Sequence, residues 1–157
     1  MVKHVLEPGI AWHVTSVTHN RQPFFLDDKA CRLLLITMQY YKYYLDYRLF
    51  AFVIMPDHFH LLLQPSDECP LSIVMNKIKG NFSNKYNRLK GRQGSVWQAG
   101  YYDKGIRDYQ GLMDRIEYIH NNPVRQGLVS SAQNYEFSSF NYYYDRPMNY
   151  LIDYPEP

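Results

Sequence analysis

The spacing of hydrophobic positions predicts short strands alternating with amphipathic helices. Residues 10–18 alternate between the two faces of a strand and are rich in β-branched side chains, which is typical of a strand with a buried face. Asp27 or Asp28 can cap the helix that follows, because a carboxylate there accepts the free amides of the first turn. The apolar positions of this helix, at helical spacing, are Ala30, Leu33, Leu34, Met38, Tyr41 and Leu45.

Two further strands are predicted at residues 49–55 and 58–64, and the turn at Pro56 and Asp57 makes them a hairpin. A second helix begins near Pro70. Its apolar stripe consists of Leu71, Val74, Met75, Ile78, Phe82, Tyr86 and Leu89. Residues 95–106 are predicted as a fourth strand, and residues 107–121 as a third helix that Pro123 ends.

This order of elements predicts an α+β protein. Strand, helix, strand, strand, helix, strand is the order of a ferredoxin-like split β-α-β fold, an antiparallel sheet with helices on one face. One additional helix toward the C-terminus follows this core. We expect a single domain over residues 1–144 and a loosely packed tail over residues 145–157. The fold hosts many functions, so it does not identify one.

Composition narrows the class of protein. The chain has 157 residues, of which 46% are hydrophobic and 20% charged, so a single globular domain with a real core is expected. Two cysteines cannot form a disulfide framework. The opening residues lack the apolar run of a signal peptide, and no apolar run approaches the length of a membrane span. A secreted scaffold, a membrane protein and a disordered chain are therefore excluded.

The distribution of charge along the chain and the number of tyrosines are both unusual. The net charge is +2, but between Cys69 and Tyr102 there are six basic residues and no acidic one, which leaves a net charge of −4 on the rest. Such a block is expected where a protein contacts a phosphate backbone, and equally where a helix face is simply solvated. The chain also has 16 tyrosines, whose rings can stack on bases or simply coat a helix. From the basic helix we select Lys77, Lys85 and Arg88 as candidate contacts to phosphate groups.

The first candidate site is the pair His58 and His60. Side chains alternate along a strand, so both imidazoles point to one face while Phe59 points to the other. Two adjacent imidazoles on a packed strand can bind a divalent metal, although a third ligand must come from elsewhere. The pattern is common, and on its own it is better explained by half-exposed strand histidines without a ligand.

The second candidate is the end of the third helix. Tyr118 and Asn122 are four residues apart and lie on one helix face. If that face turns toward the histidines, Asn122 offers an oxygen ligand and Tyr118 a hydroxyl. A phenol is a weak nucleophile at neutral pH unless a base or a metal assists it, and a metal-polarised phosphodiester is a suitable target. Each residue alone is equally explained by helix packing or by the helix end before Pro123.

Together the two motifs are more specific. The segments MPDHFHLLLQP, VWQAGYYDKGIR, YIHNNPVRQGLV and FSSFNYYY occur in this order. Over residues 10–144 the chain resembles the REP-associated tyrosine transposases, which belong to the single-tyrosine HUH transposases (His, hydrophobic, His). Phe137 and Phe140 stand where relatives commonly carry Trp or Tyr, a departure that concerns packing.

The resemblance implies a ferredoxin-like enzyme that cleaves and rejoins single-stranded DNA at hairpins formed by palindromic repeats. By position, His58 and His60 would be metal ligands, Asn122 the third ligand and Tyr118 the nucleophile. The implied intermediate is a 5′-phosphotyrosine with a free 3′-hydroxyl, and the implied cofactor is a divalent metal, Mg²⁺ or Mn²⁺. The resemblance also implies a cytoplasmic, nucleoid-associated bacterial protein that is a monomer or a homodimer, with no membrane partner.

Several points stay open at this stage. His13, on the strand expected beside the histidine pair, either approaches the metal or is structural. His120 is more consistent with a hydrogen bond at the helix end than with catalysis. The family's fourth-strand segment is matched by Gln98, Tyr101, Tyr102 and Asp103. Their spacing indicates no chemical role for them. A domesticated protein that binds DNA hairpins without cleaving them is the first alternative function, and a metal-dependent hydrolase of another substrate is the second.

Overall fold

The computed structural model describes residues 10–145 and 149–157; residues 1–9, where the sequence lacks a signal-peptide pattern, lie outside this range. The strands and longer helices in chain order are β1 (Ala11–Val17), α2 (Asp28–Leu45), β2 (Arg48–Met55), β3 (His58–Gln64), α3 (Leu71–Lys90), β4 (Tyr102–Ile106), α4 (Tyr109–Arg125) and α5 (Phe140–Asp145). Three 3₁₀ turns are η1 (His19–Arg21), η2 (Phe24–Leu26) and η3 (Ala132–Asn134).

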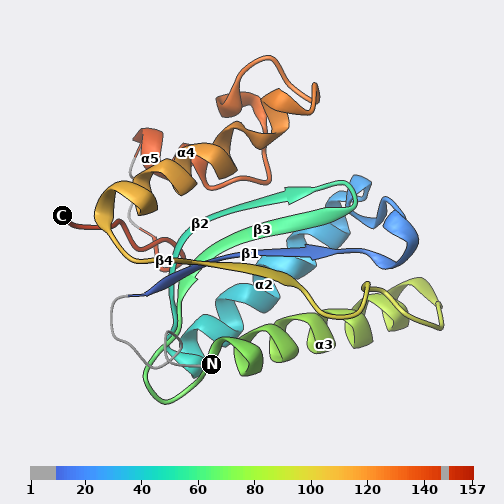
Figure 1. The fold of residues 1–157 in the computed structure, drawn as a ribbon. Helices are drawn as coiled ribbons and strands as arrows, with labels where there is room; N and C mark the ends of the chain where they lie inside the picture. Colours follow the sequence, from blue (N-terminus) through green and yellow to red (C-terminus); the bar gives the residue numbers. More distant parts are fainter. Residues whose placement is uncertain (1–9, 146–148) are drawn as a thin grey trace.

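The four strands form one antiparallel sheet in the order β2-β3-β1-β4. β1 and β2 are consecutive in sequence but are separated in space by β3, which is the split β-α-β arrangement. The α+β, ferredoxin-like class predicted from the order of elements is therefore confirmed. Figure 1 shows the sheet in the middle of the molecule with helices on both sides.

α2 and α3 cover one face of the sheet and pack against each other (Figure 1). Asp27 caps α2, because its Oδ1 accepts a hydrogen bond from the Lys29 amide at 2.9 Å. Alternate residues of β3 point into this layer, and Phe59, Leu61 and Leu63 are fully buried there. The main hydrophobic core thus lies between the sheet and these two helices.

α4 packs on the opposite face, mainly over β2 and β3 (Figure 1). Ile116 and Ile119 are buried in a second, smaller core, together with alternate residues of β2 and Leu62 of β3. On β4, by contrast, the residues from Tyr102 to Gly105 are exposed. The additional helix predicted to carry the tyrosine therefore lies on the far side of the sheet from α2 and α3.

The fourth strand is shorter than the predicted 95–106. Residues 95–101 leave the sheet because Trp97 anchors them on the α3 side, where its Nε1 donates to the Lys79 carbonyl at 3.0 Å. The Trp97 ring also contacts the rings of Phe59 and Phe82. Only a single bridge, from Thr18 to Trp97, connects this segment to the end of β1. The packing of this partly buried side chain against α3 therefore outweighs the strand-like pattern of the sequence.

The third predicted helix does not end before Pro123. α4 continues to Arg125 with Pro123 inside its last turn. Proline lacks an amide hydrogen, so the Ile119 carbonyl loses its usual helical partner. The next turn is nevertheless closed, since Gln126 N donates to the Asn122 carbonyl at 3.0 Å and Leu128 N to the Pro123 carbonyl at 2.9 Å. The prediction was wrong because a proline near a helix end removes only one bond.

The outer edge of β2 is covered by the C-terminal part of the chain. Ile54 N donates to the Phe137 carbonyl at 2.9 Å, and Ser139 N donates to the Phe52 carbonyl at 3.0 Å. Two tyrosine hydroxyls and Asp153 satisfy further backbone groups of the same edge. Leu151 and Ile152 are buried, so residues 149–154 are held against the sheet, in contrast to the loosely packed tail expected over 145–157.

Among the described residues, no helix has both the length and the apolar character needed to cross a membrane.

The aromatic core between α3 and the sheet should dominate stability. Phe82 is fully buried and contacts the rings of Phe25, Tyr86 and Trp97. We expect Phe82→Ala to lower the free energy of unfolding by about 3–5 kcal/mol, measured by urea denaturation. Tyr43→Ala, at an exposed position on α2, should change it by less than about 0.5 kcal/mol. Equal effects of the two substitutions would contradict this location of the core.

Candidate active site

β3 places His58 and His60 on the face of the sheet that α4 covers. Phe59, between them, is buried on the opposite face and contacts the ring of Trp97. The two imidazole rings lie 5.0 Å apart between centroids and are nearly perpendicular to each other. A well-packed strand therefore presents two neighbouring imidazoles toward α4.

His60 is buried and has neighbours at both ring nitrogens. Its Nδ1 lies 2.9 Å from Thr15 Oγ1 and 3.0 Å from His13 Nε2, both on the adjacent strand β1. Its Nε2 lies 3.1 Å from Nδ2 of Asn122 on α4. Burial, together with nearby positive charge, lowers the pKa of His60 to about 3. His60 is therefore neutral at pH 7, with a lone pair on one ring nitrogen.

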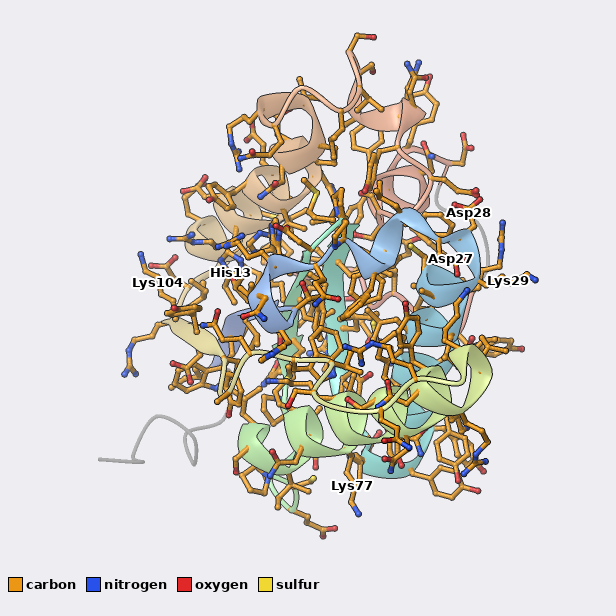
Figure 2. The ribbon with its side chains drawn as sticks, turned by 90° about the vertical axis from the view of Figure 1, so that its right-hand side faces the viewer. His13, Asp27, Asp28, Lys29, Lys77 and Lys104 are labelled. Carbon is orange, nitrogen blue, oxygen red and sulfur yellow. The ribbon has the colours of Figure 1, made fainter. Side chains whose placement is uncertain are left out.

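His13 connects β1 to both β3 and α4. It is buried, and its Nδ1 lies 3.3 Å from Nη1 of Arg115 while its Nε2 faces His60. Burial lowers the pKa of His13 to about 4, with further contributions from Arg115 and Lys104. Figure 2 shows His13 on β1 with Lys104 on the neighbouring strand. His13 thus contacts the candidate ligand His60, and whether it also approaches a metal stays a prediction.

His58 is oriented by the residue before it. Its Nδ1 lies 2.7 Å from Oδ1 of Asp57, in the turn between β2 and β3. Burial alone would raise the pKa of Asp57, but hydrogen bonds from His58 and Arg21 lower it, so the carboxylate is ionised at neutral pH. Among the described residues, Nε2 of His58 has no hydrogen-bond partner. A carboxylate that holds one nitrogen of a histidine while the other is available is typical of metal-binding histidines.

α4 brings Tyr118 and Asn122 to the histidines. Asp108 caps the helix by accepting from the Gly111 amide at 2.7 Å. The ring of Tyr118 is 42% exposed, and its centroid lies 5.8 Å from that of His13 and 6.3 Å from that of His60. Asn122 is only 4% exposed. The structure thus brings together all four residues predicted for the site, and their chemical roles stay predictions.

The candidate ligand atoms at this site fit a divalent cation. Among the described residues, Oδ1 of Asn122 is buried and has no hydrogen-bond partner, an arrangement that costs about 1–3 kcal/mol. No described group of three or more His, Cys, Asp and Glu side chains is arranged to hold a metal. A cation here would therefore need the amide oxygen of Asn122 beside the two imidazoles. Because Oδ1 of Asn122 has no hydrogen-bond partner among the described residues, its lone pairs can bind a cation.

The three basic residues selected as DNA contacts do not lie at this site. Lys77, Lys85 and Arg88 are exposed on α3, which packs on the other face of the sheet. Figure 2 shows Lys77 pointing away from the body of the protein, on the opposite side from His13. A role for them in DNA binding stays a prediction, and it would require DNA to reach the face of the sheet opposite Tyr118.

Two arginines at the site were missed by the sequence analysis. Arg115 and Arg125 lie on α4, with Cζ 5.5 Å and 4.0 Å from the centroid of the Tyr118 ring. The signal was their spacing, because positions 115, 118, 122 and 125 follow one face of a helix.

The remaining candidates have simpler places in the fold. His120 is buried, and its Nε2 lies 2.6 Å from Oγ of Ser139, which confirms the expected hydrogen bond. Burial lowers the pKa of His120 to about 4. Gln98 donates its backbone amide to the Val17 carbonyl at the end of β1. Tyr102 is exposed on β4 and pairs with Thr15 of β1, so it shares the face of the histidines.

Comparison with known families and proteins gives a consistent result. Residues 8–122 match the family model described as "Transposase IS200 like". The chain is 29% identical over 142 residues to a candidate REP-associated tyrosine transposase of Haemophilus influenzae, covering 84% of this chain and 80% of that protein. It is also 29% identical over 91 residues to a REP-associated tyrosine transposase of Escherichia coli, covering 57% of this chain and 52% of that protein.

Among solved structures, the fold resembles a REP-associated tyrosine transposase bound to a REP hairpin. The TM-score is 0.73 at 24% identity, over 88% of this chain and 81% of the other. A candidate transposase from Deinococcus radiodurans matches with a TM-score of 0.53 at 20% identity, over 71% of this chain and 88% of the other. At these identities the likeness concerns the fold.

The position of α4 depends on a buried hydrogen-bond cluster behind the site. Ser139 Oγ lies 2.6 Å from His120 Nε2 and accepts from the Phe52 amide at 2.9 Å. We expect Ser139→Ala to lower the free energy of unfolding by about 1–3 kcal/mol in urea, because it leaves buried polar groups without partners. Ser72→Ala, exposed in the first turn of α3, is the control and should have little effect. A Ser139→Ala protein as stable as this control would rule out the anchoring role.

Proposed function

Because the chain belongs to the IS200-like transposase family, we propose that it cleaves and rejoins single-stranded DNA that carries hairpins. Tyr118 is the proposed nucleophile, and His58, His60 and Asn122 are the proposed ligands of a divalent cation. The observation that carries the proposal is the convergence of these four side chains from β3 and α4, where Nδ2 of Asn122 lies 3.1 Å from His60 Nε2 and the buried Oδ1 of Asn122 has no hydrogen-bond partner among the described residues. The choice of a hairpin substrate is supported by the similar transposase whose structure holds a REP hairpin.

The proposed reaction is a transesterification. Oη of Tyr118 attacks the phosphorus of a phosphodiester, and the bond from phosphorus to the 3′-oxygen of the preceding nucleotide breaks. The phenol loses its proton and the departing 3′-oxygen gains one, which leaves a 5′-phosphotyrosine and a free 3′-hydroxyl. Attack by another 3′-hydroxyl on the phosphotyrosine reverses these bond changes and releases Tyr118. One phosphoester bond replaces another in each step, so no external energy source is needed.

The chain's own residues prepare the site for this chemistry. A bound Mg²⁺ or Mn²⁺ would offset the negative charge that grows on the phosphate oxygens. Burial keeps His60 neutral, so a cation that displaced the Asn122 amide nitrogen from His60 Nε2 would meet no competing proton there at pH 7. Asp57 fixes the ring orientation of His58 through Nδ1. The partial exposure of Tyr118 leaves its hydroxyl accessible to a strand approaching from solvent.

The nucleophile is tested by substitution with phenylalanine. We expect Tyr118→Phe to abolish the covalent protein–DNA adduct, with a loss of at least about 10³-fold in cleavage rate, and to leave hairpin binding largely intact. The measurement is a denaturing gel with a labelled hairpin oligonucleotide from the DNA flanking the protein's own gene, with Mg²⁺ or Mn²⁺ and with chelator. Tyr109→Phe, on the same helix, is the matched control and should form the adduct normally. Normal cleavage by Tyr118→Phe would place the nucleophile elsewhere, and hairpin binding by the wild-type protein without any adduct would favour a non-cleaving binding protein.

The cation ligands are tested by binding as well as by activity. We expect His58→Ala and His60→Ala to weaken Mn²⁺ binding, measured by calorimetry without DNA, by at least about 10-fold, because each removes one ligand. Cleavage should fall in parallel and be partly restored by excess Mn²⁺. His19→Ala, in η1 and outside the site, should bind Mn²⁺ like the wild type. Unchanged Mn²⁺ affinity in both site variants would refute this ligand set.

A further inference from the structure

Two guanidinium groups lie against Tyr118. Arg125 lies over the ring, with Cζ 4.0 Å from its centroid, and its Nη1 donates to the Tyr118 carbonyl at 3.3 Å. Arg115 lies one turn earlier on α4, with Cζ 5.5 Å from the same centroid and Nη1 3.3 Å from His13 Nδ1. The ring is thus contacted by two arginines from its own helix and by His13 from the sheet.

The positive charge of these arginines is not neutralised within the described part of the chain. Neither Arg115 nor Arg125 forms an ion pair with a described Asp or Glu. Asp57, the carboxylate beside the histidines, is already bonded to His58 and Arg21. Lys104 lies opposite His13 on β4 and adds a further cation on this face. Uncompensated cations around a half-exposed tyrosine favour an anionic ligand at that place.

Stacking leaves the hydrogen-bonding capacity of an arginine available. A guanidinium that lies flat on an aromatic ring keeps its N–H donors in its own plane, pointing outward from the stack. Arg125 can therefore restrict the rotation of the Tyr118 ring and still donate to a phosphate beside it. An ammonium group cannot do both, because it is a point charge without a plane.

We propose that Arg115 and Arg125 hold the Tyr118 ring between them and bind the non-bridging oxygens of the phosphate that this tyrosine attacks. The inference deepens the function proposed above and rests on it for the identity of the reaction. The two arginines position the nucleophile and bring the phosphate within its reach. Their charge also stabilises the negative charge that grows on the phosphate oxygens during attack.

The phosphate contact is tested by the salt dependence of binding, in chelator so that no cleavage occurs. Each arginine that contacts a phosphate of a single strand contributes about 0.7 to the slope of log affinity against log salt concentration. With the labelled hairpin oligonucleotide as probe, Arg115→Gln and Arg125→Gln should each reduce the slope by about that amount. Arg48→Gln is the matched control, because Arg48 also lies over a ring, that of Phe50 at 5.1 Å, but on β2 away from Tyr118. Slopes equal to that of the control would overturn the phosphate contact.

The positioning role is tested by the rate of adduct formation at saturating DNA, where weaker binding no longer matters. We expect each Gln variant to be slower than wild type by at least about 10-fold. Arg125→Lys should keep the salt slope and recover only part of the rate, since lysine supplies the charge but not the planar stack. Full recovery by Arg125→Lys would overturn the positioning role. Unfolding midpoints equal to wild type would show that the variants are folded.

The two proposals fail in different ways. If the wild-type protein forms no adduct with either metal, the proposed cleavage is wrong, and the salt slopes still decide whether the arginines contact phosphate. If the wild type forms the adduct while Arg115→Gln and Arg125→Gln match Arg48→Gln in slope and rate, Tyr118 stands as nucleophile and the arginine proposal is wrong.

Discussion

Ile116 and Ile119 hold α4 against β2 and β3, and this hydrophobic contact determines where the side chains of the candidate site lie. Both isoleucines are buried, and burial of each contributes roughly 1.5–3 kcal/mol. Tyr118 and Asn122 belong to the same helix, so this packing sets the position of their backbone, while contacts with Arg125 and His60 orient the two side chains. A rotation of α4 on the sheet would displace the phenol and the amide together. The site therefore inherits its geometry from apolar residues that take no part in the chemistry.

The electrostatics of the site divide into two kinds of group. The imidazoles of His13 and His60 are kept neutral by burial, so they can act as ligands or as hydrogen-bonding groups without carrying charge. The guanidiniums of Arg115 and Arg125 keep their charge and lie nearer to solvent. A neutral interior with a cationic rim is suited to a ligand that brings negative charge from outside.

Much of the fold and the centre of the site follow from local patterns. The alternation of β3 was sufficient to place His58 and His60 on one face, and the spacing of Tyr118 and Asn122 was sufficient to place them on one helix face. What local patterns lacked was information on long-range packing. Nothing in the sequence near Trp97 indicates that its ring will pack against α3 and shorten β4, or that α3 lies on the face of the sheet opposite the tyrosine.

The other differences between prediction and structure concern residues whose role depends on their surroundings. Proline usually ends a helix, but Pro123 lies so near the end of α4 that only one backbone bond is lost. Arg115 and Arg125 were overlooked because an isolated arginine is common on a helix surface. Their meaning depends on the ring between them and on the absence of a described carboxylate partner, and both are properties of the three-dimensional structure.

The covering of β2 by residues 135–143 and by Asp153 has a consequence for how this protein behaves outside its native state. An uncovered strand edge is a template for pairing with other chains, and β2 is eight residues long and almost entirely apolar. A chain from which these covering residues were removed would expose the edge of β2 to other chains. The opposite edge, β4, is short and carries Asp103 and Lys104, which discourage such pairing by themselves. The segment that covers β2 thus protects this edge from pairing with other chains. Removing the segment would lower solubility, although every residue of the candidate site would still be present.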